Sequence, residues 1–277
     1  MSLFKRKKVE IRFDPNTQQP AVRRSICTGE MTVGFIDRST GKFTDLMRVD
    51  SQKELEAFMK DFPAPIPVVH VEKGVGERVS RNEPGDTEEA IRLFEINCEL
   101  AERLGAEILV LHLWNGVHSD KDIEHNISAY PALNEIAKQN GLLLTIENVV
   151  CNQADPMTHL KCLANLYPEI VVTFDTKMAE FHNQLPLLYE EESAEIVRRI
   201  RHMHINDYSG GYKDWTRLKT LHIGDGQVDF EWLFAFLGEI DYRGDFTVEA
   251  TSFGSDGVID FDALNRDFAR IREWLNR

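Results

Sequence analysis

The sequence predicts an α/β protein in which parallel strands alternate with helices around a barrel. From residue 65 onward, short apolar runs alternate with amphipathic helical segments, a rhythm typical of β-α-β units. The run Leu142–Asn148 follows Gly141 and carries a carboxylate, Glu147, next to its end. A buried strand that presents an acid at its carboxyl end is what a parallel β/α barrel places at its active-site face.

The amino-acid composition supports one large globular unit or two smaller ones. The chain has 277 residues, of which 42% are hydrophobic and 28% are charged, so we expect a sizeable core and little disorder. The formal net charge is -14. Because nucleic-acid binding requires basic groups that neutralise phosphates, we expect no nucleic-acid partner.

Cysteine usage and hydropathy predict a soluble cytoplasmic protein. The four cysteines are Cys27, Cys98, Cys151 and Cys162. They form no Cys-x-x-Cys pair, which argues against a zinc knuckle or a redox motif and fits a reducing compartment. The basic stretch at residues 5–8 is not followed by an apolar segment, so we expect no signal peptide. No apolar run approaches the roughly 18 residues of a membrane span, and we expect no membrane partner.

Residues 1–62 are predicted to form a β-hairpin-rich addition that packs on the barrel or contributes to it. Val33–Asp37 and Lys42–Met47 flank a Gly-containing loop, which predicts a β-hairpin. Val9–Phe13 and Ala21–Ile26 are two further candidate strands.

Residues 63–277 are expected to form the barrel. The strand-like runs are Pro65–Val71, Glu107–Leu113, Leu142–Asn148, Glu169–Asp175, Arg201–Asp207 and Gly244–Ala250. Because helical patterns lie between most of them, the strands should be parallel with right-handed crossovers. We therefore predict a TIM-type (β/α)8 barrel, although only six of its strands are clear. The first fifty residues are a candidate source of a seventh strand. Because fewer than eight strands are evident, we expect the N-terminal part of the barrel to be irregular or incomplete.

Helix boundaries follow from capping residues and apolar faces. The expected helices are residues 51–61, which open with a capping box, Asp86–Leu104 with Gly105 as C-cap, a helix that ends at Gly141, and Leu187–Ile200. Asp229 and Asp260 are the expected N-caps of the last two helices.

Each of the six strands carries a polar side chain at or near its carboxyl end. These residues are His70, His112, Glu147, Asp175, His204 and Glu249. In a closed barrel they converge on one mouth, where imidazole and carboxylate groups suit Mn, Mg, Co, Fe or Zn. Taken singly, a histidine at a strand end is more often structural, and an acid there often caps a helix or pairs with a base. Three acids buried together without a cation would be costly, which favours a metal site.

Five segments resemble the xylose isomerase-like TIM barrel superfamily. They are Thr-Ile-Glu-Asn at 145–148, Phe-Asp-Thr at 174–176, His-Met-His-Ile-Asn-Asp at 202–207, Ile-Gly-Asp-Gly-Gln-Val-Asp-Phe at 223–230 and Thr-Val-Glu-Ala at 247–250. This superfamily includes sugar-phosphate isomerases and epimerases, inosose dehydratase and endonuclease IV. The likeness runs from about Pro65 to the C-terminus and implies the barrel fold.

The resemblance implies a site for one divalent metal ion, such as Mn, Mg, Co or Zn. The implied metal ligands are Glu147, Asp175, His204 and Glu249. Glu147 and Glu249 would also be the catalytic acid and base. The candidate substrate-binding residues are His70, His112, His182, Arg217 and His222. His70 and His112 also match positions that hold a further metal in the endonucleases.

The sequence departs from the superfamily pattern at several positions. Met178 stands where many members have a histidine three residues after the aspartate, and His182 is either its substitute or a surface residue. The endonuclease Asp-x-His is replaced by Leu-Lys-Thr at 218–220, so a third metal has no evident ligands. Lys177 is expected to be exposed, or else to neutralise an acidic substituent of the substrate. The Gly-x-Gly element fits a tight turn better than a phosphate site.

We expect an isomerase or epimerase that acts through an enediolate on a sugar, a sugar phosphate or a related hydroxy-carbonyl compound. Loss of a β-hydroxyl would instead make the protein a dehydratase. A metal-dependent phosphodiesterase like endonuclease IV is the second hypothesis. A non-catalytic barrel that binds a small molecule is the third. The expected partner is a carbohydrate-like small molecule, and homo-oligomers are left open.

Overall fold

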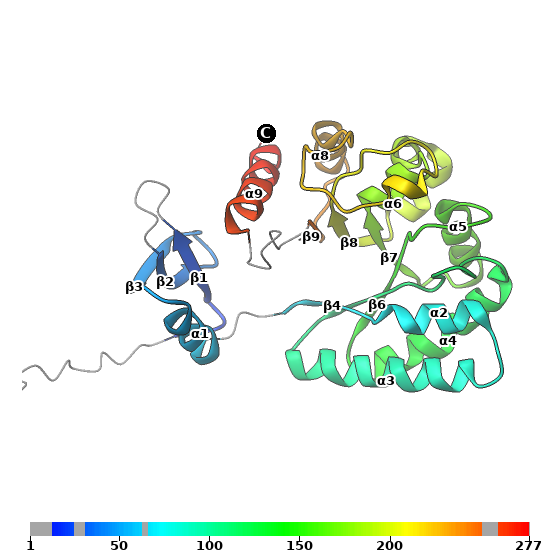
Figure 1. Cartoon of the computed structure of the whole chain (residues 1–277), viewed down its shortest axis with the longest axis horizontal. Coiled ribbons are helices and arrows are strands. Elements are labelled where there is room, and N and C mark those ends of the chain that lie inside the picture. Colours follow the sequence, from blue (N-terminus) through cyan, green and yellow to red (C-terminus); the bar gives the residue numbers. More distant parts are fainter. Residues whose placement is uncertain (1–12, 25–30, 63–65, 251–259, 277) are drawn as a thin grey trace, which may run out of the picture. The chain divides into compact units, whose positions relative to one another are not determined.

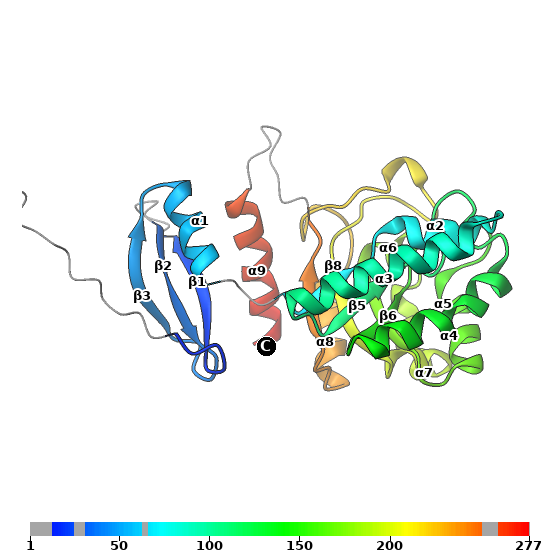
Figure 2. The ribbon, with the colours of Figure 1, turned by 90° about the horizontal axis from the view of Figure 1, so that it is seen from below.

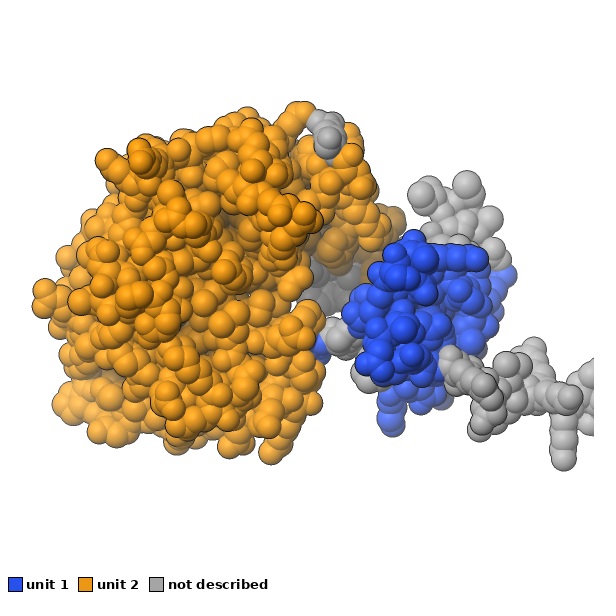
Figure 3. Space-filling view, turned by 180° about the vertical axis from the view of Figure 1, so that it is seen from behind, with its two compact units in different colours: residues 1–66 blue, residues 67–277 orange. Residues whose placement is uncertain are grey.

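The computed structural model describes residues 13–24, 31–62, 66–250 and 260–276. The chain divides into two compact units, Met1–Ile66 and Pro67–Arg277, which Figure 3 colours blue and orange. Each unit has its own buried apolar cluster. The two units are therefore described separately.

Unit 1 is a three-stranded antiparallel sheet with one helix. Its strands are β1 (Gln18–Arg24), β2 (Met31–Asp37) and β3 (Phe43–Val49). The predicted hairpin is confirmed, because β2 pairs antiparallel with β3. The expectation of a seventh barrel strand is wrong for these strands, since a short hairpin loop forces antiparallel pairing and a parallel neighbour needs a long crossover. The candidate strand Val9–Phe13 lies, except for Phe13, outside the described residues.

The helix of unit 1 covers one face of its sheet. Helix α1 (Gln52–Asp61) begins where the Ser51 side chain accepts a hydrogen bond from the Glu54 backbone N–H. The Glu54 carboxylate in turn accepts from Asp50 N, one residue before the cap, at 2.9 Å, so the predicted N-cap Ser51 is confirmed while the returning bond of the capping box reaches the preceding residue. The helix and sheet enclose a small core of Val33, Phe35, Val49, Leu55 and Phe58.

Unit 2 is organised around a six-stranded parallel sheet (Figure 1). Its strands are β4 (Val68–His70), β5 (Ile108–Leu111), β6 (Leu143–Glu147), β7 (Val171–Asp175), β8 (Ile200–Ile205) and β9 (Asp245–Val248). Each strand lies beside the next one in the sequence, and every pair is parallel. The predicted α/β class is confirmed, with a TIM-like half-barrel that contains six strands among the described residues.

Helices connect the strands and supply most of the outer layer. They are α2 (Lys73–Arg81), α3 (Asp86–Leu104), α4 (Ile123–Gln139), α5 (Pro156–Leu166), α6 (Thr176–Phe181), α7 (Ala194–Val197), α8 (Phe230–Glu239) and α9 (Phe261–Leu275). Helices α2, α3 and α4 pack on one another, and α4 lies against β6 (Figure 2). The expected N-caps Asp229 and Asp260 are confirmed. Within the described ranges, no helix is long and apolar enough to cross a membrane.

The expected helix Leu187–Ile200 is wrong. The segment consists of 3-10 turns at Leu185–Tyr189 and Glu191–Ser193, followed by the short α7. Glu190 between the turns has an extended backbone, with ψ 135°, which interrupts the helical hydrogen bonds. Ile200, the last residue of the predicted helix, is the first residue of β8.

Candidate metal centre

All six polar residues predicted at strand ends lie at the carboxyl edge of the parallel sheet. Three of them are the last residues of their strands: His70 in β4, Glu147 in β6 and Asp175 in β7. The others lie in or directly after β5, β8 and β9 and are His112, His204 and Glu249. Because the ends of parallel strands meet at one edge, residues up to 179 positions apart in the sequence (His70 and Glu249) share one site.

Glu147, Asp175, His204 and Glu249 form the first of two overlapping groups. Their ligand atoms all lie within 4.8 Å of one another. Nδ1 of His204 lies 3.1 Å from Oε1 of Glu147, 3.4 Å from Oε1 of Glu249 and 3.8 Å from Oδ2 of Asp175. Three of these side chains are buried, whereas that of Glu249 is 32% exposed. Glu249 is therefore the acid of this group that solvent or a small molecule reaches most easily.

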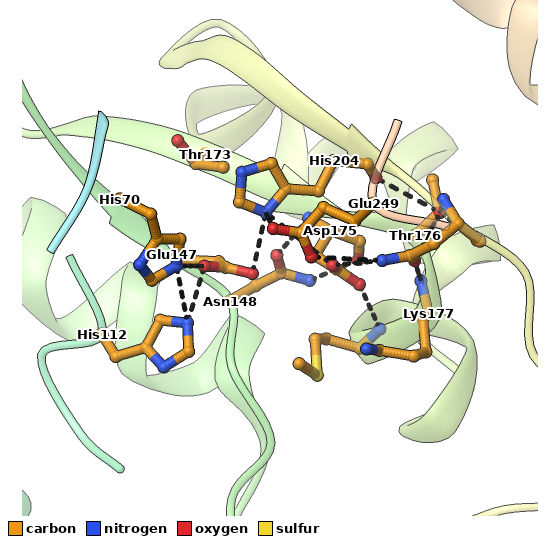
Figure 4. Close-up of polar contacts among 12 residues, drawn as sticks. His70, His112, Glu147, Asn148, Thr173, Asp175, Thr176, Lys177, His204 and Glu249 are labelled. Carbon is orange, nitrogen blue, oxygen red and sulfur yellow. Dashed lines mark hydrogen bonds and ion pairs between the residues drawn. The ribbon is translucent and has the colours of Figure 1, made fainter. Parts of the chain in front are cut away.

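His70, His112 and Glu147 form the second group. Oε2 of Glu147 lies 2.8 Å from Nε2 of His112 and 3.0 Å from Nε2 of His70. The two Nε2 atoms are 3.1 Å apart. Glu147 thus belongs to both groups, since its two oxygens face different histidines (Figure 4).

Two asparagines hold the acids in place, Asn206 through their carboxylates and Asn148 through the backbone of Asp175, and sequence reasoning did not single them out. Asn206 donates from Nδ2 to Asp175 Oδ2 at 2.9 Å and to Glu249 Oε2 at 3.5 Å. Asn148 accepts from Asp175 N at 2.6 Å and donates to Asp175 O at 3.1 Å. Both asparagines are buried. Their only sequence signal is their place beside strand ends, within two of the motif segments.

Asp175 has two functions, and one of them is structural. Its Oδ1 accepts the Met178 N–H at 2.7 Å and caps α6, while Oδ2 faces His204 and Asn206. The alternative role of this aspartate as a helix cap is therefore confirmed. The same side chain also belongs to the cluster, because its second oxygen is free of the cap. Asp207, two residues after the end of β8, accepts from the backbone N–H groups of Gly224, Gly226 and Val228. It builds the tight turn that was predicted for the Gly-x-Gly element.

Burial and close charges shift the proton affinities of the cluster in opposite directions. Burial alone would lower the pKa of His204, but the charge and hydrogen bond of Glu147, with Glu249 and Asp175, raise this pKa to about 9. Burial would raise the pKa of Glu147, but His112 and His204 hold it well below its usual range. Glu249 has a raised pKa, because its burial and the nearby Asp175 and Glu147 outweigh the attraction of His204.

The donor set fits a divalent cation. Three carboxylates and one imidazole converge within 4.8 Å, and the described residues place no lysine or arginine ion pair on these carboxylates. An oxygen-rich set with one imidazole and no thiolate suits Mn, Mg, Co or Zn rather than a thiolate-bound metal. Three mutually repelling acids are costly to bury without such a cation.

A third buried group, Asp120, Cys151 and His159, is accounted for by hydrogen bonds. Asp120 accepts from the backbone N–H groups of residues 152–154 and lies 3.0 Å from Nε2 of His159. Burial would raise the pKa of Asp120, but these donors hold it well below its usual range. This group fastens the loop after β6, and sequence reasoning missed it because its members are scattered.

Three of the candidate substrate-binding residues are not part of either cluster. His182 is buried rather than on the surface, and its Nε2 accepts from Cys151 N at 3.1 Å. Arg217 has a 64% exposed side chain and donates to Ser209 O. His222 contacts the buried Asp267 of α9 at 2.6 Å. The expected surface position of His182 is wrong because its ring fills the space behind the loop after β6.

Lys177 also differs from expectation. Its side chain is buried, with 7% of the residue exposed, and its Nζ lies 3.0 Å from Thr220 Oγ1. The expected exposed lysine is therefore wrong. Met178, which stands at the altered motif position, packs partly buried against the apolar core.

The fold and the site define a TIM-like α/β protein with a candidate metal centre at the carboxyl ends of its strands. The sequence model of the xylose isomerase-like TIM barrel family matches residues 31–276 of this chain. The chain belongs to this family.

Individual relatives are distant. Inosose dehydratase 2 of Bacillus cereus is 23% identical over 192 residues, which is 59% of this chain and 63% of that protein. The chain spans about three fifths of the length of the curated relatives it matches. A D-tagatose 3-epimerase-like protein has a TM-score of 0.61 at 22% identity, over 81% of this chain and 82% of that one. D-allulose 3-epimerase from Methylomonas sp., in complex with D-allulose, has a TM-score of 0.54 at 18% identity, over 77% and 72%. The two structural matches establish a shared fold.

Proposed function

We propose that the protein is a divalent-metal-dependent isomerase or epimerase of a carbohydrate-like hydroxy-carbonyl compound. The observation that carries this proposal is the pair Glu147 and Glu249. Glu147 ends β6 and Glu249 directly follows β9, and their carboxylates lie 3.1 Å and 3.4 Å from the same Nδ1 of His204. Their pKa values are shifted in opposite directions, the arrangement that lets one acid accept a proton while the other donates one.

Each residue has a distinct task in this proposal. Glu147, ionised, removes the proton from the carbon next to the substrate carbonyl. Glu249, whose pKa is raised and whose side chain is partly exposed, returns a proton to the neighbouring carbon or to the opposite face. Glu147, Asp175, His204 and Glu249 would hold the metal ion, which when bound polarises the carbonyl and makes the C–H more acidic. Asn206 keeps Asp175 and Glu249 in position through its amide N–H bonds.

The relatives support the reaction class without fixing the substrate. The distant relatives include an inosose dehydratase, a D-tagatose 3-epimerase-like protein and a D-allulose 3-epimerase. Both reaction types can start with removal of a proton beside a carbonyl group. A dehydratase therefore remains within the proposal, and the loops after the strands would decide which compound is bound.

The second group gives a specific reason to keep a hydrolase as the alternative. His70, His112 and Glu147 could hold a further ion that shares Glu147, and two close metals are common in phosphodiesterases. Against it, the net charge of -14 is unfavourable to a nucleic-acid substrate. A non-catalytic barrel is disfavoured by the complete set of four donors.

Solvent deuterium uptake tests the proposal directly. Ketoses, keto-inositols and their phosphates are incubated with the protein and Mn or Co in D2O, and deuterium at the α carbon is measured by NMR. We expect uptake that falls by about 100-fold or more in Glu147→Gln and in Glu249→Gln. Glu180→Gln is the matched control, since Glu180 is also a partly buried acid with a raised pKa but lies outside the cluster. Full exchange in both cluster variants would refute the assigned roles, and hydrolysis of a phosphodiester without exchange would favour the alternative.

A further inference from the structure

Lys177 is a buried cation whose positive charge is not balanced by a nearby carboxylate among the described residues. Lysine is almost never fully buried unless it is paired, yet only 7% of Lys177 is exposed. Its ammonium group has three N–H donors. Its one described partner is the neutral hydroxyl of Thr220 at 3.0 Å, and it forms no ion pair with a carboxylate among the described residues.

The position of Lys177 links it to the candidate metal centre. It is the second residue of α6, which begins directly after Asp175. Its backbone N–H donates to Asn206 Oδ1 at 3.0 Å, and the amide group of the same asparagine donates to Asp175 and Glu249. Figure 4 shows Lys177 and Thr176 beside these carboxylates.

Thr220 brings a second chain segment to the same edge of the sheet. It precedes Leu221, which pairs with Asp207 just after β8. The ammonium of Lys177 and the hydroxyl of Thr220 are therefore brought together by segments that follow β7 and β8, on the side of the sheet where these strands end. The carboxylates of the cluster contact His204 and Asn206 instead, and no ion pair joins them to this lysine among the described residues.

We propose that Lys177 and Thr220 form a subsite for an anionic group of the substrate. A phosphate or carboxylate group would supply the missing acceptors and the missing negative charge. The substrate is then an acidic carbohydrate derivative, either phosphorylated or carboxylated, rather than a neutral sugar. This inference rests on the proposed function of the adjacent cluster.

A purely structural lysine is the competing explanation, and Lys213 provides the matched control. Lys213 Nζ donates to Ala154 O at 2.9 Å and lies 5.9 Å from the ring centroid of Tyr212. Its ammonium is therefore held by the protein in the way that a structural lysine requires. Methionine has a similar length and no charge, so Lys177→Met and Lys213→Met remove the charge while they preserve most of the packing.

The first experiment needs no turnover. Inorganic phosphate is titrated calorimetrically into the full-length Mg-loaded protein and both variants, with acetate in a parallel series. Because a hydrogen bond to a charged group is a strong one, we expect Lys177→Met to weaken binding of one anion by about 10- to 100-fold. Lys213→Met should change it less than threefold. The anion whose binding is weakened by Lys177→Met identifies the subsite as one for phosphate or for carboxylate. Equal affinities of wild type and Lys177→Met for both anions would overturn the subsite.

The second experiment compares a neutral ketose with its phosphate and with the corresponding uronate. We expect Lys177→Met to lower kcat/KM about 10- to 100-fold for one acidic compound, mainly through KM, and less than threefold for the neutral one. Lys177→Arg should restore part of the loss. Equal losses on neutral and acidic compounds, together with a lower melting temperature, would identify a structural lysine. If no compound is turned over while phosphate or acetate binding still depends on Lys177, the proposed function fails and the subsite stands.

Discussion

Glu147 and His204 approach within 3.1 Å of each other although β7 separates the strands that carry them. The other carboxylate oxygen of Glu147 lies 2.8 Å from Nε2 of His112. One side chain therefore connects the two candidate metal groups. A cation held by His204 and Glu147 would lie beside the histidines that contact the other oxygen of Glu147, so this contact links the two groups.

Replacement of His204 by alanine should abolish tight metal binding. His204 is the single imidazole of the four-residue group, and its loss removes one ligand and the partner of Glu147. We expect about one divalent ion per chain in the wild type and at least 100-fold weaker binding in the variant, measured by calorimetry and elemental analysis. His222→Ala is the control, because His222 pairs with Asp267 outside the cluster. A wild-type protein with no measurable divalent affinity would refute the metal centre.

Metal affinity should rise with pH. In the metal-free protein the pKa of His204 is raised to about 9, so a metal must displace a proton from this imidazole at neutral pH. Between pH 6.5 and 8.5 we expect the apparent dissociation constant to fall by up to about tenfold per pH unit. Calorimetry in buffers of different ionisation enthalpy should detect the released proton. An affinity that does not change over this range would contradict a protonated His204.

The protein should lose stability in mild acid through His182. Burial, and next the charge of Lys213, lower the pKa of His182 to about 4, and its neutral Nε2 accepts from Cys151 N. Between pH 4 and 6.5 the unfolded chain binds the proton more tightly than the folded chain. The unfolding free energy should therefore fall as the pH falls from 6.5 towards 4, by up to about 3 kcal/mol from this residue.

The variant His182→Gln isolates this contribution. Its amide oxygen can still accept from Cys151 N but does not titrate. Urea unfolding at pH 7 and pH 5 should show a smaller loss in the variant than in the wild type. The remaining pH dependence should include His202, whose pKa is also lowered to about 4 by burial and by His204. An identical loss in both proteins would exclude His182 as the source.

Replacement of Asp207 by alanine should destabilise the fold by about 3 kcal/mol or more. The carboxylate is buried and accepts backbone N–H groups from Gly224, Gly226 and Val228. Its loss leaves these donors without acceptors. Asp225→Ala, in the same turn but exposed, should change the unfolding free energy by less than about 0.5 kcal/mol. Urea denaturation of both variants checks this, and equal effects would contradict the assigned role.

Local sequence patterns were enough to predict the alternation of strands and helices in unit 2, the hairpin of unit 1 and the caps Ser51, Asp229 and Asp260. These features depend on periodicity and on short-range hydrogen bonds, which neighbouring residues determine. The prediction failed for Leu187–Ile200, where apolar residues at helical spacing form turns instead. It also failed for the first strands, because the sequence does not reveal which sheet a strand joins.

The sequence by itself determined which polar residues end the strands, and hence that Glu147, Asp175, His204 and Glu249 could meet. Parallel strands bring such residues to one edge whatever the lengths of the connections between them. Only the tertiary structure decided that Glu147 faces both sets of histidines, that Asn206 holds two acids, that His182 and Lys177 are buried, and that Arg217 and His222 lie apart from the cluster. Side-chain direction and burial depend on packing between distant segments, and no local pattern encodes that packing.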